Sequence, residues 1–573
     1  MGLVITTPAP YTACLNYGTQ KEKKKILNYK CFTMSSTPVA IKFRWGLSAS
    51  DPEECPVIIV GQTPHLNKLS WHDVRCKLES RVSEEAWKRA LRCVSGNPGD
   101  NVEMWPRAAS IVSLPSRRSR HSAPSRSHAL AKAVRGAARE TNSFVVLVCR
   151  KRDVYASAVA IARSFPMYSA RTSVAPLAAT AGAALEPEPA SGRTLTVEIQ
   201  LVKEDARGES YPMCPEQTKR LTFVWHWTLG ARVRLALGRF HFVAPAPQEA
   251  CKVAKELDVG EPTVIRGEEL RARGMGGLYG VGRAAACPPA LVALSYRPPA
   301  AGAGGAPPAA GVAWVGKGIV YDTGGLSLKT RSSMVGMKGD CAGAAAVLGA
   351  FAAAVRARPT VPLHAVLCLA ENSVGPHATR PDDIHQLYSG RSVEINNTDA
   401  EGRLVLSDGV VYAWRDLKAD TIVDVATLTG AQGTATGKYH AGVLSNSAAL
   451  EARCVAAGLR AGELAHALPF APELHAAEFT SALADMKNSV SDRNNAQPSC
   501  AGLFILSHLG FDFPGQWLHI DMAAPAHSGD RATGYGVALL TVLFGAHTHS
   551  KLLRALSPPG PHGPHDAAHG ACA

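Results

Sequence analysis

Several common routes to function are missing from this sequence of 573 residues. Its 14 cysteines are scattered singly and no two form a CxxC pair, which argues against a disulfide framework and a cysteine zinc site. The sequence contains no HExxH ligand pair either, so His364, His385, His440 and His519 are expected to be core or surface residues. The cysteine pattern indicates a reducing compartment, and we expect a cytoplasmic protein.

Long apolar runs are also missing. The longest, residues 341–355, is mostly Ala and Gly, is shorter than a membrane span and predicts a tightly packed core helix. The N-terminal region lacks the basic stretch and apolar run of a signal peptide. No glycine-rich phosphate loop follows a predicted strand, and the glycines of residues 261–284 are expected to allow close packing. We therefore expect neither membrane contact nor nucleotide binding.

The charge is unevenly distributed along the chain. There are 61 basic and 47 acidic residues, and much of the excess lies in residues 21–25 and 107–139. A basic segment can bind nucleic acid, but residues 116–127 are rich in Ser and Pro and contain no aromatic residue. We expect a solvated, mobile loop, with a phosphorylation-controlled contact as the alternative. Nucleic-acid binding is not favoured.

What the sequence does contain is a dense group of charges between residues 313 and 403, set among glycines and apolar residues. Charges in such surroundings are costly unless they neutralise one another or bind metal. Four carboxylates against three cationic groups suit one or two divalent cations, and oxygen ligands without Cys or His favour Mg, Mn or a carboxylate-held Zn. A salt-bridge network is the alternative. The charged residues are Asp322, Asp340, Asp399, Glu401, Lys317, Lys329 and Arg403.

The spacing of these residues supports a site. VAWVGKGIVYD reads as a buried strand that ends at Asp322 before Thr-Gly-Gly, the place where open α/β sheets bind ligands. Asp399 and Glu401 are two residues apart, so on extended backbone both carboxylates would face one side. The sequence after Gly402 has the apolar spacing of a helix. Arg403, in its first turn, offers a fork of donors suited to an anion.

At these residues the chain resembles the leucine aminopeptidase family, two-metal exopeptidases with an NTDAEGR signature. The resemblance covers roughly residues 274–544, and the match at residues 397–404 is very specific. It implies two divalent cations per chain (Zn, Mn or Mg), peptide substrates with a free N-terminus and a homo-hexamer.

The resemblance also assigns metal ligands. It implies that Asp322 and Glu401 bridge the two cations and that Asp399 binds one of them. Asp340 and the amine of Lys317 would bind the other, and a lysine can act as a ligand only when it is neutral.

Catalytic and substrate-binding positions follow from the same resemblance. Lys329 would donate to the developing oxyanion, and Arg403 would hold a bicarbonate-like anion as proton shuttle. The matching substrate-binding positions are Met337, Thr427, Leu428, Gly430, Ala523 and Ala526.

The order of apolar runs predicts an α/β protein with a smaller N-terminal α/β domain and a larger C-terminal α/β catalytic domain around a mixed central sheet. We expect an extra, disordered segment at 1–38, the N-terminal domain at 39–202, an atypical junction at 203–250, the catalytic domain at 251–556 and a disordered tail at 557–573. The junction lacks the signature that the resembled family has there, so we expect impaired assembly or stability with metal binding retained.

Individual elements can be placed by the same patterns. The expected strands include residues 291–296, which we expect to pair with the strand ending at Asp322. Further strands are expected at 56–62, 143–151, 194–202, 361–370, 420–426 and 517–523, and helices at 84–94, 155–165, 251–259 and 498–509.

Two other functions stay open. The chain could be an inactive assembly or nucleic-acid-binding scaffold, although the complete ligand set counts against it. It could also be a metal-dependent hydrolase of non-peptide amides, which nothing in the sequence excludes.

Overall fold

The computed structural model describes residues 39–94, 100–138, 141–165, 193–202, 245–299 and 311–559. The expected N-terminal segment, almost all of the junction and most of the tail lie outside the described residues. The predictions made for them therefore stay predictions.

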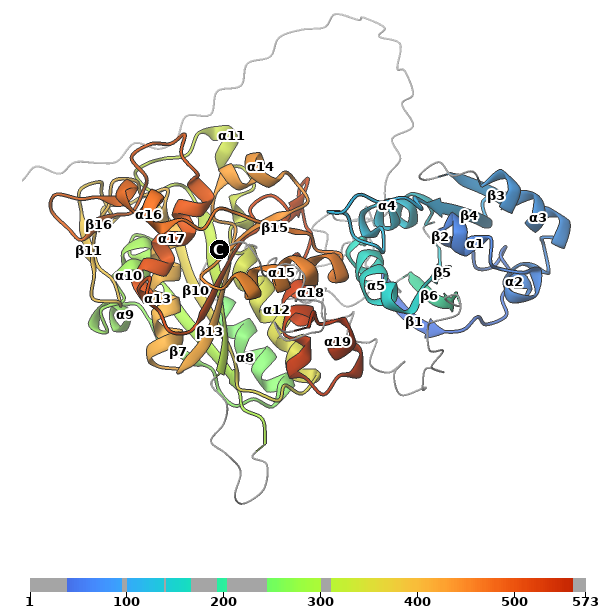
Figure 1. Ribbon diagram of the computed structural model, residues 1–573, viewed down its shortest axis with the longest axis horizontal. Coiled ribbons are helices and arrows are strands. Elements are labelled where there is room, and N and C mark those ends of the chain that lie inside the picture. Colours follow the sequence, from blue (N-terminus) through green and yellow to red (C-terminus); the bar gives the residue numbers. More distant parts are fainter. Residues whose placement is uncertain are drawn as a thin grey trace, which may run out of the picture. The chain divides into compact units, whose positions relative to one another are not determined.

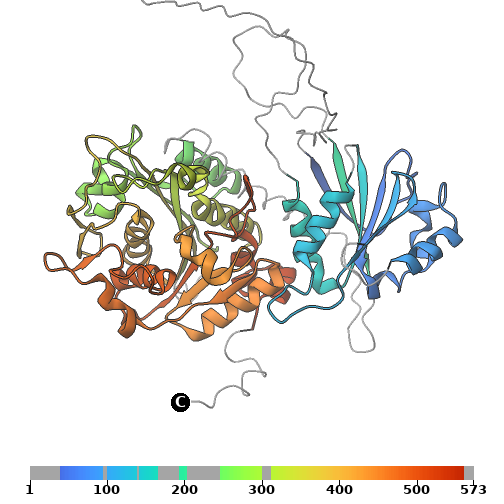
Figure 2. The same cartoon turned by 90° about the horizontal axis from the view of Figure 1, so that it is seen from above.

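The N-terminal part is built on a six-stranded sheet in the order β1-β6-β5-β2-β4-β3, parallel except for the pair β3–β4. Alternate residues of its central strands enter opposite cores, because Ile58 and Val60 belong to one apolar cluster and Val57 and Ile59 to another. Helices therefore cover both faces of the sheet, as Figure 2 shows. The strands are β1 (Ala40–Trp45), β2 (Val57–Gln62), β3 (Asn101–Trp105), β4 (Ala109–Leu114), β5 (Ser143–Cys149) and β6 (Thr194–Leu201). The helices are α1 (Thr63–Leu66), α2 (Trp71–Leu78), α3 (Glu84–Cys93), α4 (Ser127–Ala137) and α5 (Val154–Arg163).

The basic segment 116–127 runs between β4 and α4. Its first arginines are exposed, as expected for a solvated loop: Arg117, Arg118 and Arg120. Arg126 departs from that expectation, since it is buried and donates to four backbone carbonyls. The end of the loop is thus held by hydrogen bonds, and the expectation of a solvated segment was wrong for Arg126.

The C-terminal part, drawn from green to red in Figure 1, is built on a mixed eight-stranded sheet in the order β15-β14-β17-β13-β9-β10-β8-β7. The strands at its centre, β10, β9, β13 and β17, are parallel to one another. This confirms the predicted α/β class with a mixed central sheet. The strands are β7 (Thr263–Arg266), β8 (Ala290–Tyr296), β9 (Gly311–Asp322), β10 (Leu363–Asn372), β13 (Ala419–Ala426), β14 (Ala441–Ser445), β15 (Ala465–Ala467) and β17 (Gln516–Asp521).

Helices cover both faces of this sheet as well. α12 (Ala342–Arg356) packs on β9 and β10 with α18 (Val537–Leu543) against it, and α13 (Glu401–Arg415) packs with α17 (Gln497–Leu509) and α10 (Gly276–Gly282). The remaining helices are α8 (Pro245–Leu257), α9 (Glu268–Ala272), α11 (Arg331–Met334), α14 (Gly430–Thr436), α15 (Ala448–Ala461), α16 (Pro472–His475) and α19 (Lys551–Leu556). Short strands complete the part: β11 (Ile384–Gln386), β12 (Ser392–Glu394), β16 (Met486–Lys487), β18 (His527–Ser528) and β19 (Arg531–Ala532).

The Ala- and Gly-rich run forms the core helix that the sequence predicts. The segment Arg331–Arg356 is long and apolar enough to cross a membrane, but 94% of its apolar window is buried inside the fold. Small residues bring α12 close to the sheet, because a Cβ at Gly343 would lie 2.1 Å from the carbonyl oxygen of Val425. The glycines of α10 also allow close packing, since a Cβ at Gly277 would lie 2.6 Å from the carbonyl oxygen of Leu404 on α13.

The predicted pairing of residues 291–296 with the strand ending at Asp322 is wrong. These residues form β8, which pairs with β10 and β7, while β9 pairs with β10 and β13. Strand β10 therefore lies between the two, although it comes later in the chain. Strands that are consecutive in the chain often pair, but here β10 lies between β8 and β9 and pairs with both.

Candidate active site

The candidate site lies at one edge of the large sheet. Asp322 ends β9, Asn372 ends β10, Asp521 ends β17, and Thr427 directly follows β13. Because these four strands are parallel, their carboxyl ends meet at the same edge. This is the edge at which open α/β sheets bind ligands.

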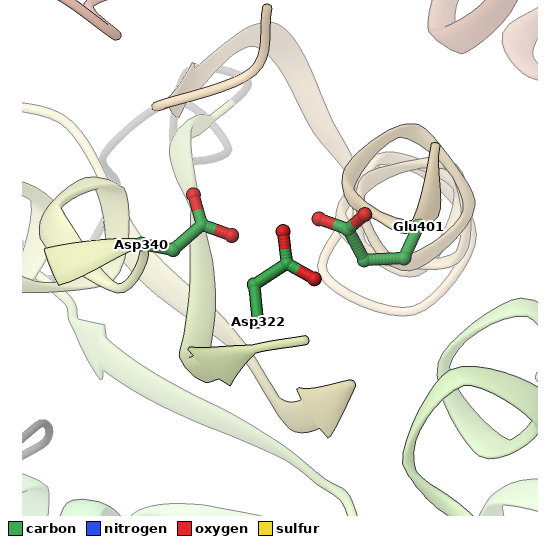
Figure 3. A group of neighbouring side chains, drawn as sticks. All are labelled: Asp322, Asp340 and Glu401. Carbon is green, nitrogen blue, oxygen red and sulfur yellow. The ribbon is translucent and has the colours of Figure 1, made fainter. Parts of the chain in front are cut away.

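Three buried carboxylates meet at this edge. Asp322, Asp340 and Glu401 each offer an oxygen within 4.8 Å of the other two. Figure 3 shows the three carboxylates turned toward one another, Glu401 from the first turn of its helix. Like charges this close repel strongly in a buried site unless a cation compensates them.

Two lysines supply positive charge to the cluster. The Nζ of Lys317, on β9, lies 2.8 Å from a carboxylate oxygen of Asp340 and 2.8 Å from one of Glu401. The Nζ of Lys329 lies 2.9 Å from Asp322 and 2.5 Å from Asp399. The structure thus brings together six of the seven charged residues singled out in the sequence.

Burial and mutual repulsion perturb the ionisation of these groups. Burial, together with the charge of Asp322, raises the pKa of Glu401 to about 8. Burial also raises the pKa of Asp340 to about 6 against the opposing effect of Lys317. Burial alone would lower the pKa of Lys317, but Asp340 and the other two carboxylates together raise it above its ordinary value. The site therefore holds protons that a bound cation would displace.

The residues present fit a divalent cation. Among the described residues, the buried Oε2 of Glu401 has no hydrogen-bond partner. In the described part of the chain, the possible ligand atoms of this cluster are carboxylate oxygens, with the amine of Lys317 beside them and without thiol or imidazole, a set suited to Mg, Mn or Zn. Asp399 has a third of its side chain exposed, so the cluster is open to solvent on that side.

Arg403 lies apart from the carboxylates. Its guanidinium carbon is 5.9 Å from the ring centres of both Phe479 and Phe504, and in the described part of the chain its buried Nη1 has no hydrogen-bond partner. Burial lowers the pKa of Arg403 to about 10. A buried cation with an open donor is suited to hold a small anion.

The expected substrate-binding positions differ in exposure, and Thr427 contacts Asp340 of the cluster. Met337, Thr427 and Leu428 are half-buried and Gly430 is exposed at the start of α14. Ala523 is half-buried as well. The last expected position, Ala526, is buried in the apolar core beside α12.

The backbone expected at Asp399 and Glu401 is wrong. Asp399 lies in a turn, where the Asn397 side chain accepts a hydrogen bond from its backbone N–H at 2.9 Å, and Glu401 is already helical. The two carboxylates consequently contact different lysines, Lys329 and Lys317.

Sequence reasoning missed a second layer of contacts. The side-chain amide of Asn372 donates to Asp322 at 2.9 Å and to the carbonyl of Thr398 at 3.1 Å. The Thr398 hydroxyl in turn donates to the carbonyl of Gly324 at 2.7 Å, within the turn after β9. The position of Asn372 at the end of a strand that lies beside β9 could have indicated that its side chain reaches Asp322.

The fold and the site together define an α/β metallohydrolase with a carboxylate-rich centre at the end of a mixed sheet. Residues 242–541 match the family model described as the cytosol aminopeptidase family, catalytic domain, and residues 55–174 match the M17 aminopeptidase N-terminal domain 2. The chain belongs to the cytosol aminopeptidase family, a family of metal-dependent aminopeptidases.

Individual relatives of this chain are named as aminopeptidases too. The chain is 51% identical over 537 residues to a human protein named probable aminopeptidase NPEPL1, covering 91% of this chain and 96% of that one. It is 40% identical over 519 residues to leucine aminopeptidase 1 of Caenorhabditis elegans, covering 89% and 99%. The solved structure of a Caenorhabditis elegans leucine aminopeptidase superposes with a TM-score of 0.79 at 34% identity, covering 90% and 100%. A Trypanosoma brucei leucyl aminopeptidase in complex with actinonin gives 0.72 at 33%, covering 89% and 96%.

Proposed function

We propose that this aminopeptidase removes the N-terminal residue of peptides with a free α-amine, using two divalent cations (Zn, Mn or Mg). The buried cluster of Asp322, Asp340 and Glu401 carries the proposal, because among the described residues only Lys317 and Lys329 form ion pairs with these three carboxylates. Asp322 and Glu401 would bridge the cations. Asp399 would bind one cation, and Asp340 with Lys317 the other. Bound cations supply an activated water and polarise the scissile carbonyl.

The two lysines have different roles in this proposal. The side chain of Lys317 is 3% exposed, so it is available to the cations and not to a substrate. Lys329 is 15% exposed and lies between Asp322 and Asp399 at the open side of the cluster. Lys329 is therefore the group that can donate a hydrogen bond to the developing oxyanion.

The remaining residues bind and orient. Arg403 would hold a bicarbonate-like anion, which would supply a proton shuttle at the site. The backbone of Leu428 and Gly430 would hold the peptide, and Met337 and Thr427 would line the pocket for its first side chain, with Met337 as an adaptable apolar wall. The substrate amine would lie near Asp340, which restricts cleavage to the first residue.

The proposal also covers location, assembly and domain limits. We infer a cytoplasmic homo-hexamer that does not bind membranes or nucleic acid. The domain limits 39–202 and 251–556 belong to the proposal as well.

Metal analysis and a peptide library test the function together. The purified protein should hold two divalent ions per chain, and Asp322→Ala and Glu401→Ala should each lose both, whereas Asp340→Ala should mainly weaken one. Peptides with a free amine should be cleaved and amine-blocked versions should not. Absence of metal after growth with Zn and Mn would contradict the site, and cleavage of non-peptide amides alone would contradict the substrate class.

A further inference from the structure

A short loop touches the carboxylate cluster from the side of β13. Residues 427–429 connect β13 to α14. The hydroxyl of Thr427 donates to a carboxylate oxygen of Asp340 at 2.7 Å, and its carbonyl accepts from the Nζ of Lys317 at 3.0 Å. One residue thus contacts both of the groups proposed to bind the same cation.

The other side of this loop is held by a buried carboxylate. Asp521, fully buried at the end of β17, accepts from the backbone N–H groups of Leu428 and Thr429, each at 3.1 Å. It also accepts from the hydroxyl of Thr429 at 2.7 Å and from the N–H of Ala523 at 3.2 Å. A buried carboxylate with four donors has little freedom to move, so the loop is fixed relative to the sheet.

We propose that Thr427 is a positioning residue of the metal site, which orients Asp340 through its hydroxyl and Lys317 through its carbonyl, and that Asp521 holds it in place. The proposal rests on the proposed function, since it takes Lys317 and Asp340 as ligands of a cation. It gives the hydroxyl a task other than substrate binding. A hydroxyl has one proton to donate, and here Asp340 receives it.

The test compares Thr427→Val with Thr427→Ser. Valine keeps the shape and removes the donor, whereas serine keeps the donor. Mn²⁺ affinity is measured by competition with a chelator on the metal-free full chain, together with metal content. For Thr427→Val we expect one of the two ions to bind roughly 10- to 100-fold more weakly, the range measured for groups that orient metal ligands. Thr427→Ser should restore most of that affinity. Thr421→Val, at the far end of β13, is the matched control and should bind Mn²⁺ normally.

The outcomes separate the two proposals. If the unmodified chain binds none of Mn²⁺, Zn²⁺ and Mg²⁺, the proposed function fails. If it binds two ions and Thr427→Val binds both with unchanged affinity, the role of Thr427 is refuted. If Thr427→Val does not fold, Mn²⁺ affinity is measured on Asp521→Asn instead. This variant replaces one acceptor oxygen of Asp521 by a donor, which should release the loop and weaken the binding of one ion. Selective weakening of one ion supports the proposal, and unchanged affinity overturns it.

Discussion

Gly402→Ala places a methyl group against the proposed metal-binding lysine. A Cβ at this position would lie 2.6 Å from Cε and 2.8 Å from Nζ of Lys317. To restore a separation of about 3.4 Å, Cε has to move by about 0.8 Å. The amine would then lose its 2.8 Å contacts with Asp340 and Glu401. Since a misplacement of about 1 Å costs roughly a hundredfold in rate, we expect a loss of this size with weakened binding of one ion.

The fold itself should tolerate this change. Gly402 is helical, so alanine gains about 0.8–1 kcal/mol in helix propensity. That gain offsets part of the roughly 1–3 kcal/mol that overpacking costs. Turnover, metal content and thermal unfolding are measured together, with Gly136→Ala as control because a Cβ there meets open space in α4. Normal turnover and metal content in Gly402→Ala would refute the assigned place of Lys317.

Three further predictions follow from the charges of the site. Lys329→Ala should lower turnover by roughly a hundredfold, the usual effect of losing one oxyanion donor. Elemental analysis of this variant should still find two ions per chain. Unchanged turnover would show that Lys329 does not donate to the oxyanion. Cation affinity should rise with pH between 6 and 9, because burial raises the pKa of Glu401 to about 8 and binding must displace its proton; calorimetry in buffers of different ionisation heat should detect the release. In the metal-free protein the raised pKa of Glu401 also contributes to the free energy of unfolding, and this contribution is fully present below the ordinary pKa of 4.5. It should be lost as the pH rises through about 8, which chemical unfolding at a series of pH values can measure.

The helices and strands were predictable because the spacing of apolar residues within each segment indicates its secondary structure. Apolar runs predicted β2, β5, β10 and β17, and apolar spacing predicted α3 and α17, with limits that differ by a few residues. The charged cluster was predictable for a related reason: Asp322 follows a buried strand directly.

The contacts that hold the cluster could not be predicted from local pattern. Asn372 reaches Asp322 across 50 residues of chain, and Asp521 reaches Leu428 across 93. The turn at Asp399 depends on the side chain of Asn397, which can form hydrogen bonds that compete with extended backbone. The pairing of β8 depended on where β10 would lie, which only the assembled sheet decides.

The strand order of the large sheet has a consequence for biosynthesis. β13 has β9 on one side and β17 on the other, and β17 ends at Asp521, late in the chain. A ribosome-bound chain that has not yet released β17 therefore leaves the β13 edge unpaired and the carboxylate cluster without its anchor. Pairings this distant in sequence form slowly, and unpaired strand edges promote aggregation. We therefore expect the loop after β13 to reach its final place at the carboxylate cluster only after Asp521 has been synthesised.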